Sequence, residues 1–164
     1  RVYDAEQLVR RMFENADESG SRAIEIVGST MTLPIERKFA SVDSVERYAA
    51  AVLGLNWVRA RWPRATQPIR VRERAGQGAA HYESGTATLA IPTLASSRHR
   101  GVKAWALREL VVLHEIAHHL AEPDEEPHGP EFTGRFVELA SEVIGPEAGL
   151  LLRVTLSDCG ALIG

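Results

Sequence analysis

The stretch LHEIAHHL, residues 113–120, lies inside a long apolar segment, and the pattern around it predicts one helix from Lys103 to Ala121. Leucine, valine, isoleucine and alanine cover most of the girth of this helix, which is typical of a buried central helix. Pro123 follows the segment and is expected to end it. Because polar side chains are costly to bury, two histidines and a glutamate inside such a helix need a chemical reason.

The spacing within this helix favours a metal site. His114 and His118 are four residues apart, so both imidazoles lie on one face, with Cβ atoms about 5–6 Å apart. That is the reach needed to bind one Zn²⁺ with Zn–N bonds of about 2.0–2.1 Å. Glu115 follows the first ligand and is expected beside the metal, as the base that takes a proton from water. The alternative is that neighbouring groups simply satisfy the three polar side chains in a core.

A catalytic zinc usually has three protein ligands and an open position for water. His128 is the best third ligand, because it precedes a predicted helix in a turn flanked by glycine and proline, where Gly129 allows close approach of the backbone. Its alternative role is that of a histidine in a surface loop. Glu138, on the following helix, is the main rival for the third position, and otherwise a carboxylate facing solvent.

Two further observations limit the metal site. The HExxHxxGxxH pattern is absent, because residues 121 and 124 are Ala121 and Asp124, so a metzincin is not expected. His119 points about 100° away from His118 around the helix. We therefore expect His119 to support the site or the core and not to bind the ion.

The remaining pattern predicts an α+β fold in one domain, residues 1–164, with a small, mostly antiparallel sheet packed on the central helix. The expected helices are Asp4–Ala16, Ser44–Arg61, Pro130 to about Val143, and Pro146–Ser157. The expected strands are Arg22–Leu33, Ile69–Arg74, and a hairpin of Ala79–Tyr82 and Thr86–Ile91 around Glu83-Ser84-Gly85; Ser96–Gly101 is expected to be a basic, polar loop.

Composition narrows the function classes. The chain has 164 residues, 45% of them hydrophobic and 25% charged, with a formal net charge of -3, as in ordinary globular domains. Cys159 is the single cysteine, which excludes an intramolecular disulfide and a cysteine-rich metal site. No apolar run approaches the roughly 18 residues of a membrane span, and no signal peptide is visible, so a cytoplasmic location is expected. Nothing in the composition indicates an oligomeric state.

The metal-site residues resemble those of SprT-like zincins, in which HExxH is followed by a short loop and an HGxxF element. Here the two elements are HEIAH, residues 114–118, and HGPEF, residues 128–132. The chain is more closely similar, over most of its length, to a bacterial family of small HExxH metallohydrolases. The resemblance implies a minigluzincin-like core, with a strand beside the active-site helix, His128 as the third zinc ligand and Phe132 packed under it. The loop before His128 is short and acidic and no zinc ribbon follows, so the DNA-linked roles of some SprT-like proteins do not carry over.

The expected chemistry is hydrolysis of a carbonyl compound, most simply a peptide or protein, by zinc-activated water with Glu115 as general base. Tyr82, His81 and His119 are candidate donors to the oxyanion, with Tyr82 preferred. The alternative is that Tyr82 is simply a half-buried tyrosine of a strand. If Thr86–Ile91 is an edge strand, it could pair with an extended peptide; otherwise it is a half-buried strand.

Two other functions stay open at this point. An arginine cluster could bind nucleic acid, although such a cluster is more often a solvated face; it comprises Arg59, Arg61, Arg64, Arg70, Arg72 and Arg74. Acidic residues near His128 would repel phosphate there. A structural zinc is the second alternative, with Asp124 or Glu131 as the fourth ligand of a closed site.

Overall fold

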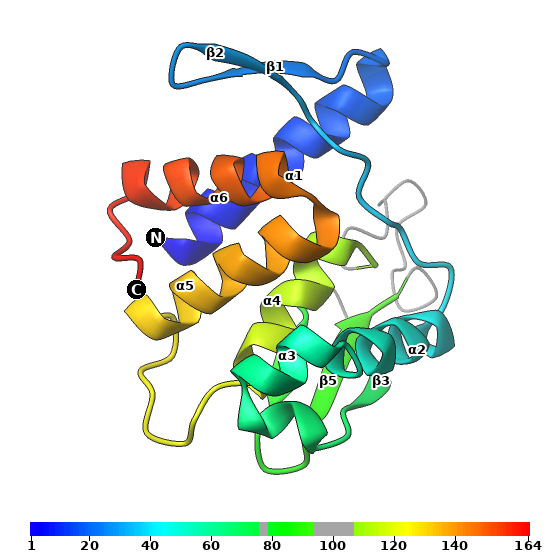
Figure 1. The fold of residues 1–164 in the computed structure, drawn as a ribbon. Coiled ribbons are helices and arrows are strands. Elements are labelled where there is room, and N and C mark those ends of the chain that lie inside the picture. Colours follow the sequence, from blue (N-terminus) through cyan, green and yellow to red (C-terminus); the bar gives the residue numbers. More distant parts are fainter. Residues whose placement is uncertain (76–78, 94–106) are drawn as a thin grey trace. The chain divides into compact units, whose positions relative to one another are not determined.

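A computed structural model of the chain describes residues 1–75, 79–93 and 107–164 (Figure 1). The expected loop Ser96–Gly101 and the first residues of the expected central helix lie outside the described residues. The chain forms two compact units, one of residues 1–36 and 124–164 and the other of residues 37–123. Helices and small sheets make the fold α+β, as predicted. No helix among the described residues is long and apolar enough to cross a membrane.

The first unit begins with α1, Val2–Ser19, which extends the helix expected at Asp4–Ala16 by a few residues at each end. Its apolar side is buried at Ala5, Val9 and Phe13. Gly20, at φ 71°, ends the helix and donates its N–H to the Ala16 carbonyl over 3.1 Å. α1 packs against α6, Pro146–Asp158, the last helix of the chain.

A hairpin replaces the single strand that we expected over Arg22–Leu33. Strand β1, Ala23–Ile26, pairs antiparallel with β2, Ser29–Thr32, and Ile26 lies opposite Ser29. Val27 and Gly28 form the turn with φ angles of 50° and 75°. Positive φ at both central residues is what a type I′ turn requires. The sequence concealed the turn because a β-branched valine is rarely found at positive φ.

Two proline-initiated helices complete the first unit. α5 spans Pro130–Leu139 and continues as a π-helical turn, η3, over Ala140–Ile144, so the helical stretch ends where the sequence predicted. α6 then begins at Pro146, and α5 and α6 pack together. In both helices proline occupies the first turn. The N–H groups of the first turn have no partner within the helix, so the N–H that proline lacks costs no helical hydrogen bond.

The second unit begins with two helices where we expected one over Ser44–Arg61. α2 spans Val42–Leu53, starting from a capping box at Ser41, and α3 spans Asn56–Arg61. The helix breaks because Gly54 caps α2, its N–H bonding back to Ala50, and Leu55 is extended. A short 3₁₀ helix, η1, Pro63–Thr66, follows the Trp62-Pro63 stop that the sequence indicated.

The main sheet has three strands in the order β3-β5-β4. β3 is Arg70–Arg74, β4 is His81–Glu83 and β5 is Thr88–Pro92. β4 and β5 are antiparallel, as the predicted hairpin requires, whereas β3 and β5 are parallel. β5 is buried throughout and has a partner strand on each side, so the suggestion that Thr86–Ile91 forms a free edge for a peptide is wrong.

The central helix of this unit, α4, spans Glu109–His119 and ends close to the predicted position. It begins later than expected, because Arg108 is extended. Lys38 forms an antiparallel bridge with Arg108, and the Leu107 carbonyl accepts the N–H of Phe39 over 2.9 Å. These bonds use the backbone groups that a longer helix would have needed.

Candidate metal centre

Helix α4 carries the HExxH residues inside the core of the second unit. All of its residues except His118 are buried, including His114 at 1% and Glu115 at 4% exposure. The rings of His114 and His118 have centroids 5.0 Å apart and planes at 62°. The two imidazoles therefore lie on one face of the helix, as their spacing predicted, and His118 is the half-buried one of the pair.

The start of α4 is anchored by the buried carboxylate of Glu109, which is 2% exposed. It accepts hydrogen bonds from the Tyr48 hydroxyl at 2.7 Å, the Arg37 backbone N–H at 2.8 Å and the Arg37 guanidinium at 3.3 Å. A negative charge in the first turn also interacts favourably with the helix dipole. Burial, followed by the charge of Glu109, raises the pKa of Tyr48 far above its ordinary value, so the phenol stays protonated and donates. We did not predict this cluster from the sequence.

His119 is fully buried and both of its ring nitrogens are hydrogen-bonded. Nε2 lies 2.8 Å from the Gln67 carbonyl, and Nδ1 lies 2.9 Å from the Tyr82 hydroxyl. Because a carbonyl only accepts, Nε2 carries the proton and Nδ1 accepts from Tyr82. Burial lowers the pKa of His119 below its ordinary value, although the bond to Gln67 opposes the shift. His119 is therefore a neutral core residue with no nitrogen left for a metal, in agreement with its predicted supporting role.

The candidate oxyanion donors on β4 have other partners. Tyr82 donates its hydroxyl proton to His119, and burial raises the pKa of its phenol. His81 Nε2 lies 3.3 Å from the carboxylate of Glu83, on the other side of the strand from Tyr82. Neither contact favours the donor role that we had assigned most readily to Tyr82.

His128 lies in the first unit, in the turn that leads into α5. Its backbone has φ 62°, a conformation that costs a residue other than glycine about 1–3 kcal/mol. Its ring meets the ring of Phe132 edge-on, with centroids 4.8 Å apart, which matches the packing role that the resemblance implies for Phe132. The ring of Tyr3 makes a second edge contact at 4.9 Å. Strain and ring contacts together indicate that the surrounding structure holds His128 in one orientation.

The loop before His128 is itself anchored to α5. The guanidinium of Arg135, which is 5% exposed at the side chain, contacts both carboxylate oxygens of Glu125 at 2.6 Å. Gly129 donates its N–H to the Glu126 carbonyl over 2.9 Å, and a Cβ at residue 129 would lie only 3.1 Å from that carbonyl oxygen. A side chain at residue 129 would therefore press against this tight turn next to His128.

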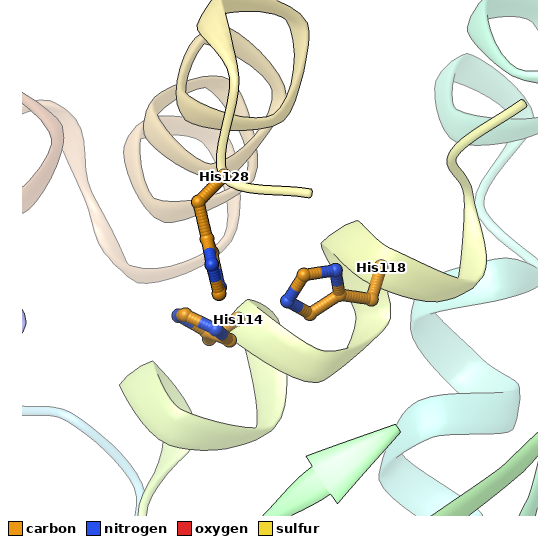
Figure 2. A group of neighbouring side chains, drawn as sticks. All are labelled: His114, His118 and His128. Carbon is orange, nitrogen blue, oxygen red and sulfur yellow. The ribbon is translucent and has the colours of Figure 1, made fainter. Parts of the chain in front are cut away.

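One imidazole nitrogen from each of His114, His118 and His128 can be chosen so that all three lie within 4.8 Å of one another. Figure 2 labels these three histidines and shows His114 and His118 on α4. In the described ranges, this group includes neither the rival ligand Glu138 nor the acidic residues Asp124 and Glu131. Three imidazoles are a donor set that suits Zn²⁺, and three protein ligands leave one tetrahedral position for water.

The arginine cluster that suggested nucleic-acid binding is partly occupied by contacts within the protein. Arg72 pairs with Glu83, Arg74 donates to the Ala79 carbonyl, and Arg64 donates to the His119 carbonyl at 3.0 Å. Arg59 donates to the Leu53 carbonyl at 3.3 Å. These bonds support the reading of the cluster as part of the fold and of a solvated face.

We compared the chain with protein-family models, with curated proteins and with solved structures, and none of the three comparisons gave a match.

Proposed function

We propose that this chain is a zinc-dependent hydrolase, most simply a metallopeptidase, with a zincin-like core of the minigluzincin type. The observation that carries the proposal is the pair His114 and His118 on one face of a buried helix, with Glu115 buried beside them. Placing three polar side chains in such a helix is costly unless they serve a purpose. The HGxxF resemblance and the three-histidine group support His128 as the third ligand.

In this proposal each residue has a distinct role. His114, His118 and His128 would hold the ion through neutral ring nitrogens. When bound, zinc lowers the pKa of a coordinated water toward about 7 and polarises the substrate carbonyl. Glu115 would take a proton from the attacking water on its carboxylate and would pass that proton to the leaving amine. His119 and Glu109 hold α4 in place from its two ends.

The substrate class is a peptide or protein carbonyl rather than a phosphodiester. The turn before His128 carries exposed carboxylates at Glu122, Asp124 and Glu126. Negative charge next to the metal would repel a phosphate backbone and would tolerate or favour a cationic peptide. Several arginines that could have met phosphates are bonded to the protein instead.

A structural, non-catalytic zinc is the second candidate. A closed site has four protein ligands, and the three-histidine group favours an open site instead. Co²⁺ substitution would distinguish the two, because exchange of the open position with an added anion changes the visible spectrum of an open site only.

The decisive variant is Glu115→Gln, tested on a mixture of short peptides with product detection by mass spectrometry. We expect the variant to retain one zinc per chain and to lose hydrolysis by a factor of about 10²–10⁴, the usual contribution of a general base. Glu138→Gln is the control, because it changes a carboxylate that the proposal leaves out of the chemistry. Equal turnover by Glu115→Gln and the wild type would refute the role of Glu115.

A further inference from the structure

Tyr3 is an exposed residue whose ring nevertheless contacts a proposed metal ligand, His128. It is 57% exposed on the first turn of α1, yet its ring meets the ring of His128 edge-on, with centroids 4.9 Å apart and planes at 70°. Leu8, the other large apolar side chain of α1 that is strongly exposed, is 46% exposed. Tyr3 and His128 belong to the same compact unit.

Phe132 contacts His128 from a second direction. Its ring is 1% exposed and meets His128 at 4.8 Å, with planes at 89°. The imidazole therefore has one buried and one exposed aromatic neighbour, each in an edge arrangement that aromatic pairs prefer. These contacts restrict the ring torsions of a residue whose backbone is already held at φ 62°.

The start of α1 is fixed independently of His128. The side chain of Arg1 donates to the Gly160 carbonyl at the end of α6 over 3.0 Å, and Val2 and Ala5 are buried on either side of Tyr3. The Tyr3 ring is thus carried by a helix turn that is itself held in place by these contacts.

We propose that Tyr3 is a positioning residue for the metal centre, and that its ring orients the imidazole of His128 toward the ion. This inference rests on the proposed function, since it assumes that His128 is a ligand. A ligand that is already oriented loses less rotational freedom when the metal binds, so the affinity for metal is higher. Partners that orient metal-binding histidines commonly affect affinity in this way.

The test is zinc affinity, measured by competition with a chromophoric chelator, for the wild type, Tyr3→Ala, Tyr3→Phe and Leu8→Ala. We expect Tyr3→Ala to bind zinc about three- to tenfold more weakly, the range that corresponds to one aromatic pair. Tyr3→Phe should bind as the wild type does, because it keeps the ring that meets His128. Leu8→Ala should also match the wild type, which controls for loss of an exposed apolar side chain from α1. The thermal midpoints of all four proteins, measured without metal, should agree closely.

The visible spectrum of the Co²⁺ protein is a second measurement, and it does not depend on the stability of the fold. Tyr3→Ala should shift the d–d bands of the bound Co²⁺, whereas Tyr3→Phe should leave them unchanged. Unchanged zinc affinity in Tyr3→Ala would overturn the positioning role, as would equal weakening in Tyr3→Phe or in Leu8→Ala. Absence of zinc binding by the wild type is a separate outcome, because it would refute the proposed function itself.

Discussion

The hydroxyl of Tyr48 donates to Oε1 of Glu109 at 2.7 Å, which ties α2 to the first residue of the helix that carries His114 and His118. Glu109 is 2% exposed and accepts two further bonds from Arg37. The orientation of the HExxH helix therefore depends on a buried polar cluster five residues before its first histidine.

Tyr48→Phe removes one donor from this cluster while keeping the ring. A hydrogen bond to a charged group contributes about 1.5–3 kcal/mol, so we expect a loss of that size in the free energy of unfolding. Urea denaturation followed by circular dichroism would measure it. The exposed Tyr3→Phe change should alter stability by less than about 0.5 kcal/mol. Equal stability of Tyr48→Phe and the wild type would contradict the anchoring role of Glu109.

The His119→Ala variant tests whether His119 is a core residue or a metal ligand. The change removes the partner of the Tyr82 hydroxyl and of the Gln67 carbonyl and leaves a cavity, so we expect a destabilisation of about 2–4 kcal/mol. Zinc content at a temperature where the variant is folded should remain stoichiometric, in contrast to His118→Ala. Loss of zinc from folded His119→Ala would show that the residue belongs to the metal site.

Gly149→Ala tests the packing of α6 on η3. A Cβ at residue 149 would lie 2.5 Å from the Cβ of Ser141, a distance that real side chains do not reach. Forced repacking of this kind costs about 1–3 kcal/mol. Gly85→Ala is the matched control, since nothing lies within 4 Å of its added Cβ. The two thermal midpoints should differ, with Gly149→Ala lower.

Val27→Asn should stabilise the hairpin in the first unit. Val27 is 82% exposed at φ 50°, where a β-branched residue is strained, and asparagine followed by glycine is the preferred type I′ pair. We expect a gain of about 1 kcal/mol in the free energy of unfolding. Val27→Ala should gain less, because alanine lacks the preference of asparagine for positive φ. A lower thermal midpoint for Val27→Asn would contradict the turn assignment.

Much of this fold follows from local sequence signals. Pro130 and Pro146 mark the starts of α5 and α6, and the four-residue spacing of His114 and His118 places both rings on one face. The hairpin at Val27 and the break at Gly54 were missed. The first has no Asn-Gly signature, and glycine inside a helical pattern does not by itself end a helix.

Contacts between distant parts of the chain could not be predicted from local sequence patterns. The parallel pairing of β3 with β5 makes Thr88–Pro92 a central strand, although its alternating pattern is equally compatible with an edge. Tyr3 contacts His128 across more than a hundred residues of sequence, and no periodicity signals such a contact. A carboxylate in an otherwise apolar helix start was the one signal that could have revealed the role of Glu109.

Elemental analysis of zinc in the purified chain, after dialysis against a weak chelator, tests the central claim most directly. We predict one zinc per chain in the wild type, in Glu115→Gln and in Glu138→Ala, and loss of tight zinc in His118→Ala and His128→Ala. A wild-type protein without zinc would contradict the proposed metal centre. Retention of stoichiometric zinc in His128→Ala, together with its loss in Glu138→Ala, would show that the third ligand is Glu138.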